Sequence, residues 1–134
     1  MDTSNILIVD DNPEIREIIE ILLTGEGFTT FKAEDGMTAL KLINEQDFDL
    51  IILDIMMPHM DGYQACKEIK KNNNVPFIML SARGEEYDKL IGFDLGIDDY
   101  VTKPFSPKEL VARIKAVTKR REVTSNIYEI FSCR

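Results

Sequence analysis

Leu50-Ile51-Ile52-Leu53-Asp54 is the stretch of sequence that decides the fold. Four consecutive apolar residues, without polar alternation, are typical of a strand in a parallel sheet that is covered on both faces. The same pattern occurs near the N-terminus, in Ile6-Leu7-Ile8-Val9-Asp10-Asp11. Both runs end in acidic residues. The sequence therefore predicts a buried parallel sheet with polar groups at the ends of its strands.

Shorter apolar segments alternate with stretches of helical periodicity along the rest of the chain. Asn12-Pro13 is a typical helix start, and the apolar stripe that follows is expected to end at Gly25. Further strands are expected at 28–31, 76–80 and 100–101, and further helices at 35–46, 61–71, 85–95 and from 106 onward. Five successive strand-then-helix units predict an α/β fold with a doubly wound, five-stranded parallel sheet.

The composition is that of one compact domain. The chain has 134 residues, of which 44% are hydrophobic and 30% charged, and its formal net charge is −8. Such an acidic surface repels the phosphates of nucleic acids, so this segment is not expected to contact DNA directly. Two cysteines, Cys66 and Cys133, do not suggest a disulfide framework, which favours a cytoplasmic location. No apolar run is long enough for a bilayer, and no membrane association is expected.

Polar residues follow the ends of four of the predicted strands. They are Asp10 with Asp11, Asp54, Ser81 and Lys103. Because ligands of open α/β sheets bind at the carboxyl ends of the strands, we expect these side chains to share one crevice. Three carboxylates in a partly desolvated cleft repel one another, and a hard divalent cation such as Mg²⁺ removes that repulsion. The lysine adds a positive charge suited to a phosphoryl oxygen.

Each of these residues also has an ordinary structural interpretation. Asp10-Asp11-Asn12 could be a turn and helix cap, Asp54 a turn residue, and Ser81 and Lys103 solvated side chains. Their joint placement at the strand ends favours a site instead. A glycine-rich phosphate loop is absent from the sequence, and His59 is the only histidine, so nucleotide loops, histidine triads and multi-histidine metal sites have no support.

Four segments together resemble the response-regulator receiver domain of two-component signalling. They are Ile6–Asp11, Leu53–Pro58 with Asp61-Gly62 following, Leu80–Ala82, and Asp99–Phe105, and the match spans residues 5 to 120. The resemblance implies a flavodoxin-like (βα)5 fold with strand order 2-1-3-4-5. It also implies that the chain is a signalling switch rather than an enzyme, and that a sensor histidine kinase phosphorylates it in the presence of Mg²⁺.

The same resemblance implies a role for each site residue. Asp54 would be the phosphoacceptor, and Lys103 and Ser81 would contact the phosphoryl oxygens. The implied Mg²⁺ ligands are Asp10, Asp11, Asp54 and the backbone carbonyl of Met56. Ser81 and Tyr100 would form the switch, with Tyr100 turning inward after phosphorylation, and the Lys103-Pro104 peptide bond would be cis.

Charged residues of mixed sign in the last third of the sequence resemble the dimer face of OmpR/PhoB-type transcription factors. The implied intersubunit pairs are Lys89 with Glu109, Asp99 with Arg113, and Asp98 with Arg120. The alternative is a solvated surface whose salt bridges add little stability. In that subfamily a C-terminal domain binds DNA. We therefore expect a receiver over residues 1–121, a homodimer on phosphorylation, and over 122–134 a linker or the first strand of a missing effector domain.

Two other classes of function stay open at this point. A phosphohydrolase of the haloacid dehalogenase type also uses a strand-end aspartate and Mg²⁺, but it needs a second aspartate where this chain has Met56. A pure interaction module would not need the full set of acids together with Lys103. Phosphorylation-dependent switching is the function that the sequence favours.

Overall fold

The structure is a computed structural model that describes residues 4–57, 61–71, 73–82 and 96–132, with side chains up to Lys119 except that of Ala82. Its centre is a sheet of five parallel strands in the order β2-β1-β3-β4-β5. The strands are β1 (Asn5–Val9), β2 (Thr29–Ala33), β3 (Leu50–Asp54), β4 (Phe77–Ala82) and β5 (Asp99–Lys103). The α/β class, the parallel sheet and the strand order expected from the sequence are confirmed.

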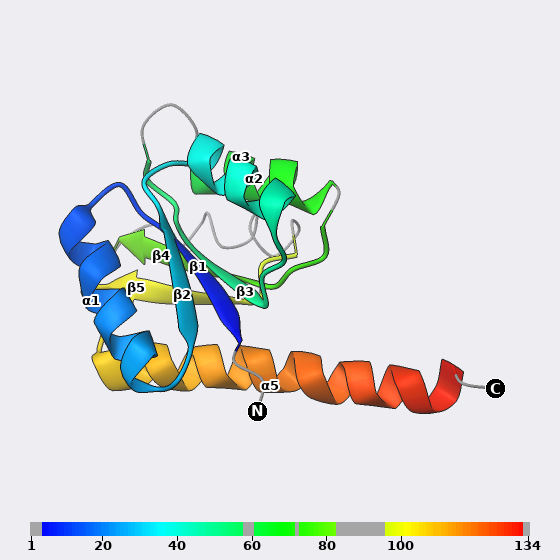
Figure 1. Cartoon of the computed structure of the whole chain (residues 1–134). Helices are drawn as coiled ribbons and strands as arrows, with labels where there is room; N and C mark the ends of the chain where they lie inside the picture. The colour runs from blue at the N-terminus through cyan, green and yellow to red at the C-terminus, as the bar shows by residue number, and fades with distance from the viewer. Residues whose placement is uncertain (1–3, 58–60, 72, 83–95, 133–134) are drawn as a thin grey trace.

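Helices cover both faces of the sheet. They are α1 (Pro13–Gly25), α2 (Gly36–Glu45), α3 (Gly62–Lys70) and α5 (Pro107–Ser132). Figure 1 shows α2 and α3 together on one side, and α1 and α5 on the other. The helix predicted over residues 85–95 lies outside the described residues. None of the helices in the described ranges combines the length and apolar composition that a membrane crossing requires.

Strand residues alternate between two hydrophobic cores. On β1, Leu7 and Val9 belong to the core beneath α2 and α3, whereas Ile6 and Ile8 belong to the core beneath α1 and α5. Successive side chains of a strand point to opposite faces, so a strand covered on both sides must be apolar at every position. This geometry explains the uninterrupted apolar runs in the sequence.

Side-chain caps fix the helix starts close to the carboxyl ends of the strands. Asn12 accepts a hydrogen bond from the Glu14 N–H (2.9 Å), and Asp61 accepts one from the Gln64 N–H (2.8 Å). Asp35 caps α2 in the same way. Each cap satisfies a backbone donor that the first helical turn leaves without a partner. The caps therefore hold α1 and α3 next to the edge where β1 and β3 end.

Two helix ends differ from the sequence prediction. Helix α1 includes Gly25, and the left-handed residue that reverses the chain is Gly27, at φ 91°. The other difference is α5, which continues through Ser132, so a strand within residues 122–132 is wrong. After Pro107 the sequence contains neither glycine nor proline, the residues that most readily stop a helix. In Figure 1 this helix runs well past the edge of the sheet.

Candidate functional site

One lysine side chain contacts residues at the carboxyl ends of two other strands of the sheet. Lys103 ends β5, Asp54 ends β3, and Asp10 directly follows β1. The Lys103 Nζ atom lies 2.9 Å from Asp10 Oδ2 and 3.4 Å from Asp54 Oδ1. The convergence of these residues at one edge, predicted from their places after the strands, is present in the fold.

Three carboxylates form an acidic cluster, which consists of Asp10, Asp11 and Asp54. One oxygen atom of each residue lies within 4.8 Å of the oxygens of the other two. Asp10 and Asp54 are buried, at 0% and 5% exposure, whereas Asp11 is exposed. Negative charges this close repel one another strongly where water is largely excluded. The cluster therefore needs positive charge to be fully ionised.

The turn after β1 serves both a structural and a potential chemical purpose. Asn12 caps α1, as described above, so the helix-cap interpretation holds for that residue. Asp10 Oδ1 accepts a hydrogen bond from the Asn12 N–H at 2.9 Å, which fixes the direction of its carboxylate. The Arg16 guanidinium donates to the Asp10 carbonyl oxygen at 2.6 Å. Because Asn12 caps the helix, the carboxylates of Asp10 and Asp11 are not needed as caps and belong to the acidic cluster.

The protonation of Asp54 reflects the charge imbalance of the site. The pKa of the Asp54 carboxyl is raised from 3.8 to about 6, mainly by burial and in part by the negative charge of Asp10. The positive charge of Lys103 and the hydrogen bond from the Met56 N–H, at 3.2 Å, act in the opposite direction. Two buried carboxylates thus share one ammonium group, and the site carries unbalanced negative charge at neutral pH.

Lys103 stays protonated in this environment. Burial acts to lower the pKa of its ammonium, but the hydrogen bond to Asp10 and the charges of Asp10 and Asp54 together raise it above the usual 10.5. A protonated lysine supplies a fixed positive charge without any metal. The peptide bond from Lys103 to Pro104 is cis.

The acidic cluster has the donor atoms that a hard divalent cation prefers. Its carboxylate oxygens are close together, and two of the three carboxylates are buried, with Lys103 as the cation that contacts them among the described residues. Mg²⁺ binds carboxylate oxygens and keeps several waters, so the exposed Asp11 side of the cluster suits it. The residues present therefore fit a divalent cation. The role of the Met56 carbonyl as a further ligand stays a prediction.

Ser81 and Tyr100 are both buried, at 2% and 7% exposure. Tyr100 belongs to the hydrophobic core beneath α2 and α3, where Met79 and Ile97 also lie. The ring is thus inside the protein, and its movement inward after phosphorylation stays a prediction. That Ser81 and Tyr100 form a switch stays a prediction.

The residues predicted for a dimer face make contacts within a single chain. Arg113 Nη1 lies 2.8 Å from both Asp99 carboxylate oxygens, and Arg113 Nε lies 3.4 Å from Glu109 Oε1. Asp98 Oδ2 accepts a hydrogen bond from the Phe77 N–H at 2.9 Å. Lys89 and the side chain of Arg120 lie outside the described residues. The three intersubunit pairs stay predictions, and each includes at least one residue that already makes a contact within the chain.

Two residues near the site were not given a role from the sequence. One is Arg16, already described. The other is Gly62, the first residue of α3, where a Cβ atom would lie 2.5 Å from the carbonyl oxygen of Asp54 and 2.7 Å from Ile55 Cα. Only glycine allows the helix to approach β3 so closely. The sequence Asp61-Gly62, a capping aspartate followed directly by glycine, is the pattern that could have predicted this close contact.

Comparison with known proteins matches a part of the chain that includes Asp10, Asp54 and Lys103. Residues 6–115 match a protein-family model described as the response regulator receiver domain. The receiver domain of the Francisella response regulator 1452 has a similar solved structure, with a TM-score of 0.83 and 40% identity. The similarity covers 89% of this chain and 99% of that one.

Two relatives are longer proteins named probable transcriptional regulator ycf27. The one from Guillardia theta is 53% identical over 115 residues, which is 86% of this chain and 45% of the relative. The one from Porphyra purpurea is 47% identical over 123 residues, or 91% of this chain and 51% of the relative. The chain thus spans about half the length of the curated relatives it matches.

Proposed function

This chain belongs to the response regulator receiver domain family, and from that premise we propose that it is a phosphorylation-dependent switch whose phosphoacceptor is Asp54. One observation carries the assignment of this residue. Asp54 ends the central strand β3 and is 5% exposed, and its carboxylate lies close to those of Asp10 and Asp11 and to the Lys103 ammonium. A nucleophile in this position lies beside two carboxylates that can bind a cation and beside the positive charge of Lys103.

Differences among the three carboxylates favour Asp54 over its neighbours. Asp10 is fully buried and is held by two hydrogen bonds of 2.9 Å, from Lys103 and from the Asn12 N–H. Asp54 Oδ1 makes longer contacts, 3.2 Å to the Met56 N–H and 3.4 Å to Lys103. Weaker contacts leave its oxygen more available to form a new bond. Asp11 is exposed, which suits a cation ligand better than an enclosed nucleophile.

The transfer itself requires little of the protein beyond placement of charge. An Asp54 oxygen forms a bond to phosphorus while the bond from phosphorus to the donor's histidine nitrogen breaks, and the electron pair of that bond stays on the nitrogen. With a pKa of about 6, Asp54 is largely ionised above neutral pH, so no general base is needed. Lys103 pairs with the negative oxygens of the transferred group. Mg²⁺, held by Asp10, Asp11 and Asp54, would supply further charge neutralisation.

Phosphorylation then adds about one to two negative charges at Asp54, which attract the Ser81 hydroxyl. Ser81 and Tyr100 lie on the adjacent strands β4 and β5, so a shift at the serine reaches the ring through direct neighbours. We propose that this shift favours the inward, buried position of the Tyr100 ring.

The wider setting of the switch is also part of this proposal. The relatives named transcriptional regulators support a role in transcription, with an OmpR/PhoB-type DNA-binding domain beyond a receiver that ends near residue 121. The partners would be a sensor histidine kinase and, after phosphorylation, a second copy of the chain. The chain would act as a switch and not as an enzyme, and in the cytoplasm.

A labelling experiment with a small phosphodonor tests the proposal. With acetyl phosphate and Mg²⁺, intact-mass measurement should show one added phosphoryl group, and Asp54→Asn should abolish it. A phosphohydrolase would instead turn over phosphate without lasting label, and an interaction module would take no label. Stoichiometric labelling of Asp54→Asn with no label on another aspartate would show that the acceptor is misassigned.

A further inference from the structure

Arg16 directs its guanidinium at a backbone oxygen beside the acidic cluster. The Nη1 atom donates a hydrogen bond of 2.6 Å to the carbonyl oxygen of Asp10. None of the ion pairs among the described residues includes Arg16. This arginine is the fourth residue of α1, close to the positive end of the helix dipole, where a cation is unfavourable. The contact with Asp10 therefore explains the arginine better than helix stability or ion pairing does.

Each polar group of Asp10 has a hydrogen-bond partner in the structure. The N–H donates to the Ala33 carbonyl at 3.2 Å, and the two carboxylate oxygens accept from the Asn12 N–H and from Lys103, each at 2.9 Å. Arg16 supplies the hydrogen bond to the remaining group, the carbonyl oxygen. Because Asp10 is fully buried, removal of the arginine would leave a buried carbonyl without this partner, which is unfavourable.

The same carbonyl belongs to the peptide group that joins Asp10 to Asp11. Rotation of that peptide would move the Asp11 carboxylate, because the group is planar and rigid. Asp11 is exposed, and no hydrogen bond within the described ranges holds its carboxylate. The hydrogen bond from Arg16 therefore limits where that carboxylate lies, and in the structure it lies within the acidic cluster.

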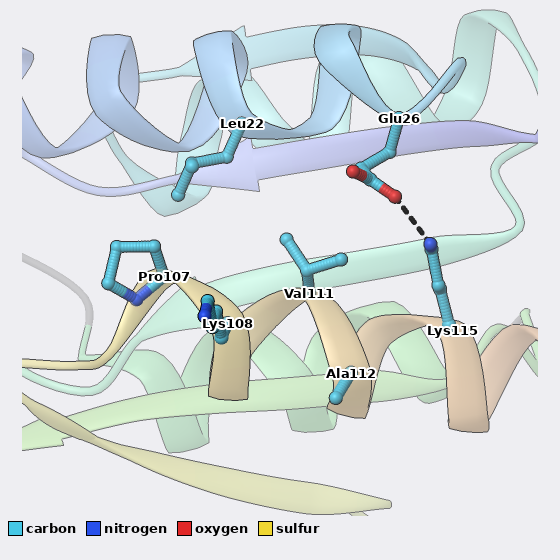
Figure 2. Close-up of a pocket in the computed structure, with 7 residues that line it drawn as sticks. All are labelled: Leu22, Glu26, Pro107, Lys108, Val111, Ala112 and Lys115. Atoms are coloured by element: carbon cyan, nitrogen blue, oxygen red, sulfur yellow. Dashed lines mark ion pairs between the residues drawn. The ribbon is translucent and has the colours of Figure 1, made fainter.

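Helix α1 is anchored independently of this hydrogen bond. Ile19 and Leu23 are fully buried in the core beneath α1 and α5. Just after the helix, Glu26 forms an ion pair with Lys115 of α5, as Figure 2 shows. Arg16 therefore extends from a fixed support. Its removal should alter the turn before α1 rather than unfold the helix.

We propose that Arg16 is a positioning residue for the cation site, and that it holds the peptide between Asp10 and Asp11 so that the Asp11 carboxylate stays within the acidic cluster. This inference rests on the divalent cation that the proposed function assigns to the cluster. Groups that hold a metal ligand without touching the metal typically change metal affinity about 10–100-fold. The guanidinium also repels a cation, but water on the exposed Asp11 side screens that repulsion. Positioning therefore outweighs repulsion, and the two effects on affinity have opposite signs.

Titration of the unphosphorylated chain with Mg²⁺ at constant ionic strength, followed by NMR amide shifts, tests the proposal. Arg16→Met keeps an apolar stem but removes the donors and the charge, and it should raise the Mg²⁺ dissociation constant about tenfold. Arg16→Lys retains a charge and a donor for the single hydrogen bond, so its dissociation constant should lie between those of the parent and Arg16→Met. Lys67→Met is the matched control, since it changes the net charge equally but lies in the last turn of α3. It should change the dissociation constant little.

A double change shows whether Arg16 acts through Asp11. In an Asp11→Ala background the positioned ligand is gone, so Arg16→Met should add little to the loss of affinity. The proposal is overturned by full additivity of the two losses, by an unchanged or lower dissociation constant in Arg16→Met, or by an Arg16→Lys variant as weak as Arg16→Met. The amide spectra also verify the fold of each variant.

The titration contains no phosphodonor, so it is independent of phosphorylation at Asp54. A parent without Mg²⁺-dependent shifts would remove the cation site and the role of Arg16 together. A chain that binds Mg²⁺ as expected but takes no phosphoryl label would contradict the proposed function alone.

Discussion

Arg113 and Asp99 form a two-point ion pair within one chain, with Nη1 at 2.8 Å from each carboxylate oxygen. The resemblance to OmpR/PhoB-type transcription factors implies that these two residues also pair between subunits. An arginine already held by its own chain must release or share its partner to bind a second molecule, so the intrachain pair competes with the proposed dimer. The pair is partly exposed, and its loss should cost the monomer about 1 kcal/mol or less.

Reversing Arg113 tests its part in the phosphorylated dimer. Arg113→Glu should lower the dimer fraction that phosphorylation produces while the yield of phosphorylated Asp54 stays the same, because like charges then face each other twice per dimer. Adding Asp99→Lys should recover part of the loss. Sedimentation of the phosphorylated proteins measures this, with Lys41→Glu, on exposed α2 surface, as control. Equal dimer fractions in all variants would show that this pair is not at the interface.

The raised pKa of Asp54 predicts how stability depends on pH without metal. Between pH 3.8 and about 6 the folded protein holds a proton that the unfolded chain releases, so stability falls as pH rises through this window. Above pH 6 the ionised carboxylate costs the folded state on the order of 1–3 kcal/mol. Asp54→Asn should therefore be more stable than the parent at pH 8 by that amount, and equally stable below pH 4.

Urea unfolding at the two pH values, in the presence of a chelator, gives both free energies. Asp47→Asn is the matched control because Asp47 is an exposed aspartate away from the acidic cluster. It should change the free energy of unfolding little at either pH. If Asp54→Asn gains as much at pH 4 as at pH 8, the gain does not come from ionisation of Asp54.

Mg²⁺ should stabilise the folded chain, since it binds the assembled acidic cluster and not the unfolded one. At a free concentration one hundred times its dissociation constant the gain is about 2.7 kcal/mol. Asp11→Ala removes an exposed ligand, so it should change little without metal but should weaken Mg²⁺ binding and slow phosphorylation together. Thermal unfolding across a Mg²⁺ titration measures the effect. An Asp11→Ala variant that binds Mg²⁺ like the parent would place the metal elsewhere.

Gly62 and Gly25 provide a matched pair of glycine-to-alanine changes. At Gly62 the new methyl group would meet the Asp54 carbonyl oxygen and Ile55 Cα, so α3 or the end of β3 must move. We expect a loss of about 1–3 kcal/mol and slower phosphorylation. At Gly25, inside the last turn of α1, nothing lies within 4 Å, and alanine should stabilise by up to about 1 kcal/mol. Similar effects of the two changes in urea unfolding would contradict the close contact at Gly62.

Patterns local in the chain predicted most of the fold. Strands such as Ile6–Val9 were clear because burial on both faces leaves no polar position. Helix ends were less clear. Gly25 is a residue type that often ends a helix, but the left-handed conformation after α1 occurs at Gly27. The continuation of α5 through Ser132 was not predicted, although the sequence after Pro107 contains no glycine or proline to interrupt the backbone.

The site was predictable in position but not in its detailed contacts. Asp10, Asp54 and Lys103 follow or end strands of a parallel sheet, and the carboxyl ends of such strands lie at one edge, so their proximity was predictable. That Lys103 lies closer to Asp10 than to Asp54 depends on side-chain directions that no sequence pattern encodes. The same holds for Arg16, whose guanidinium contacts a backbone carbonyl rather than a charged group. The burial of Tyr100 likewise depends on neighbours contributed by several elements.

The long last helix also has a mechanical consequence. Helix α5 is anchored to the sheet by Leu110, Ile114 and Val117, and its backbone continues to Ser132. Each residue adds about 1.5 Å, so the backbone of the helix extends about 20 Å past Val117. A tilt of about 5° at the anchored part then moves the tip by about 2 Å. A small tilt of α5 where it packs against the sheet therefore becomes a larger displacement at the end of the helix.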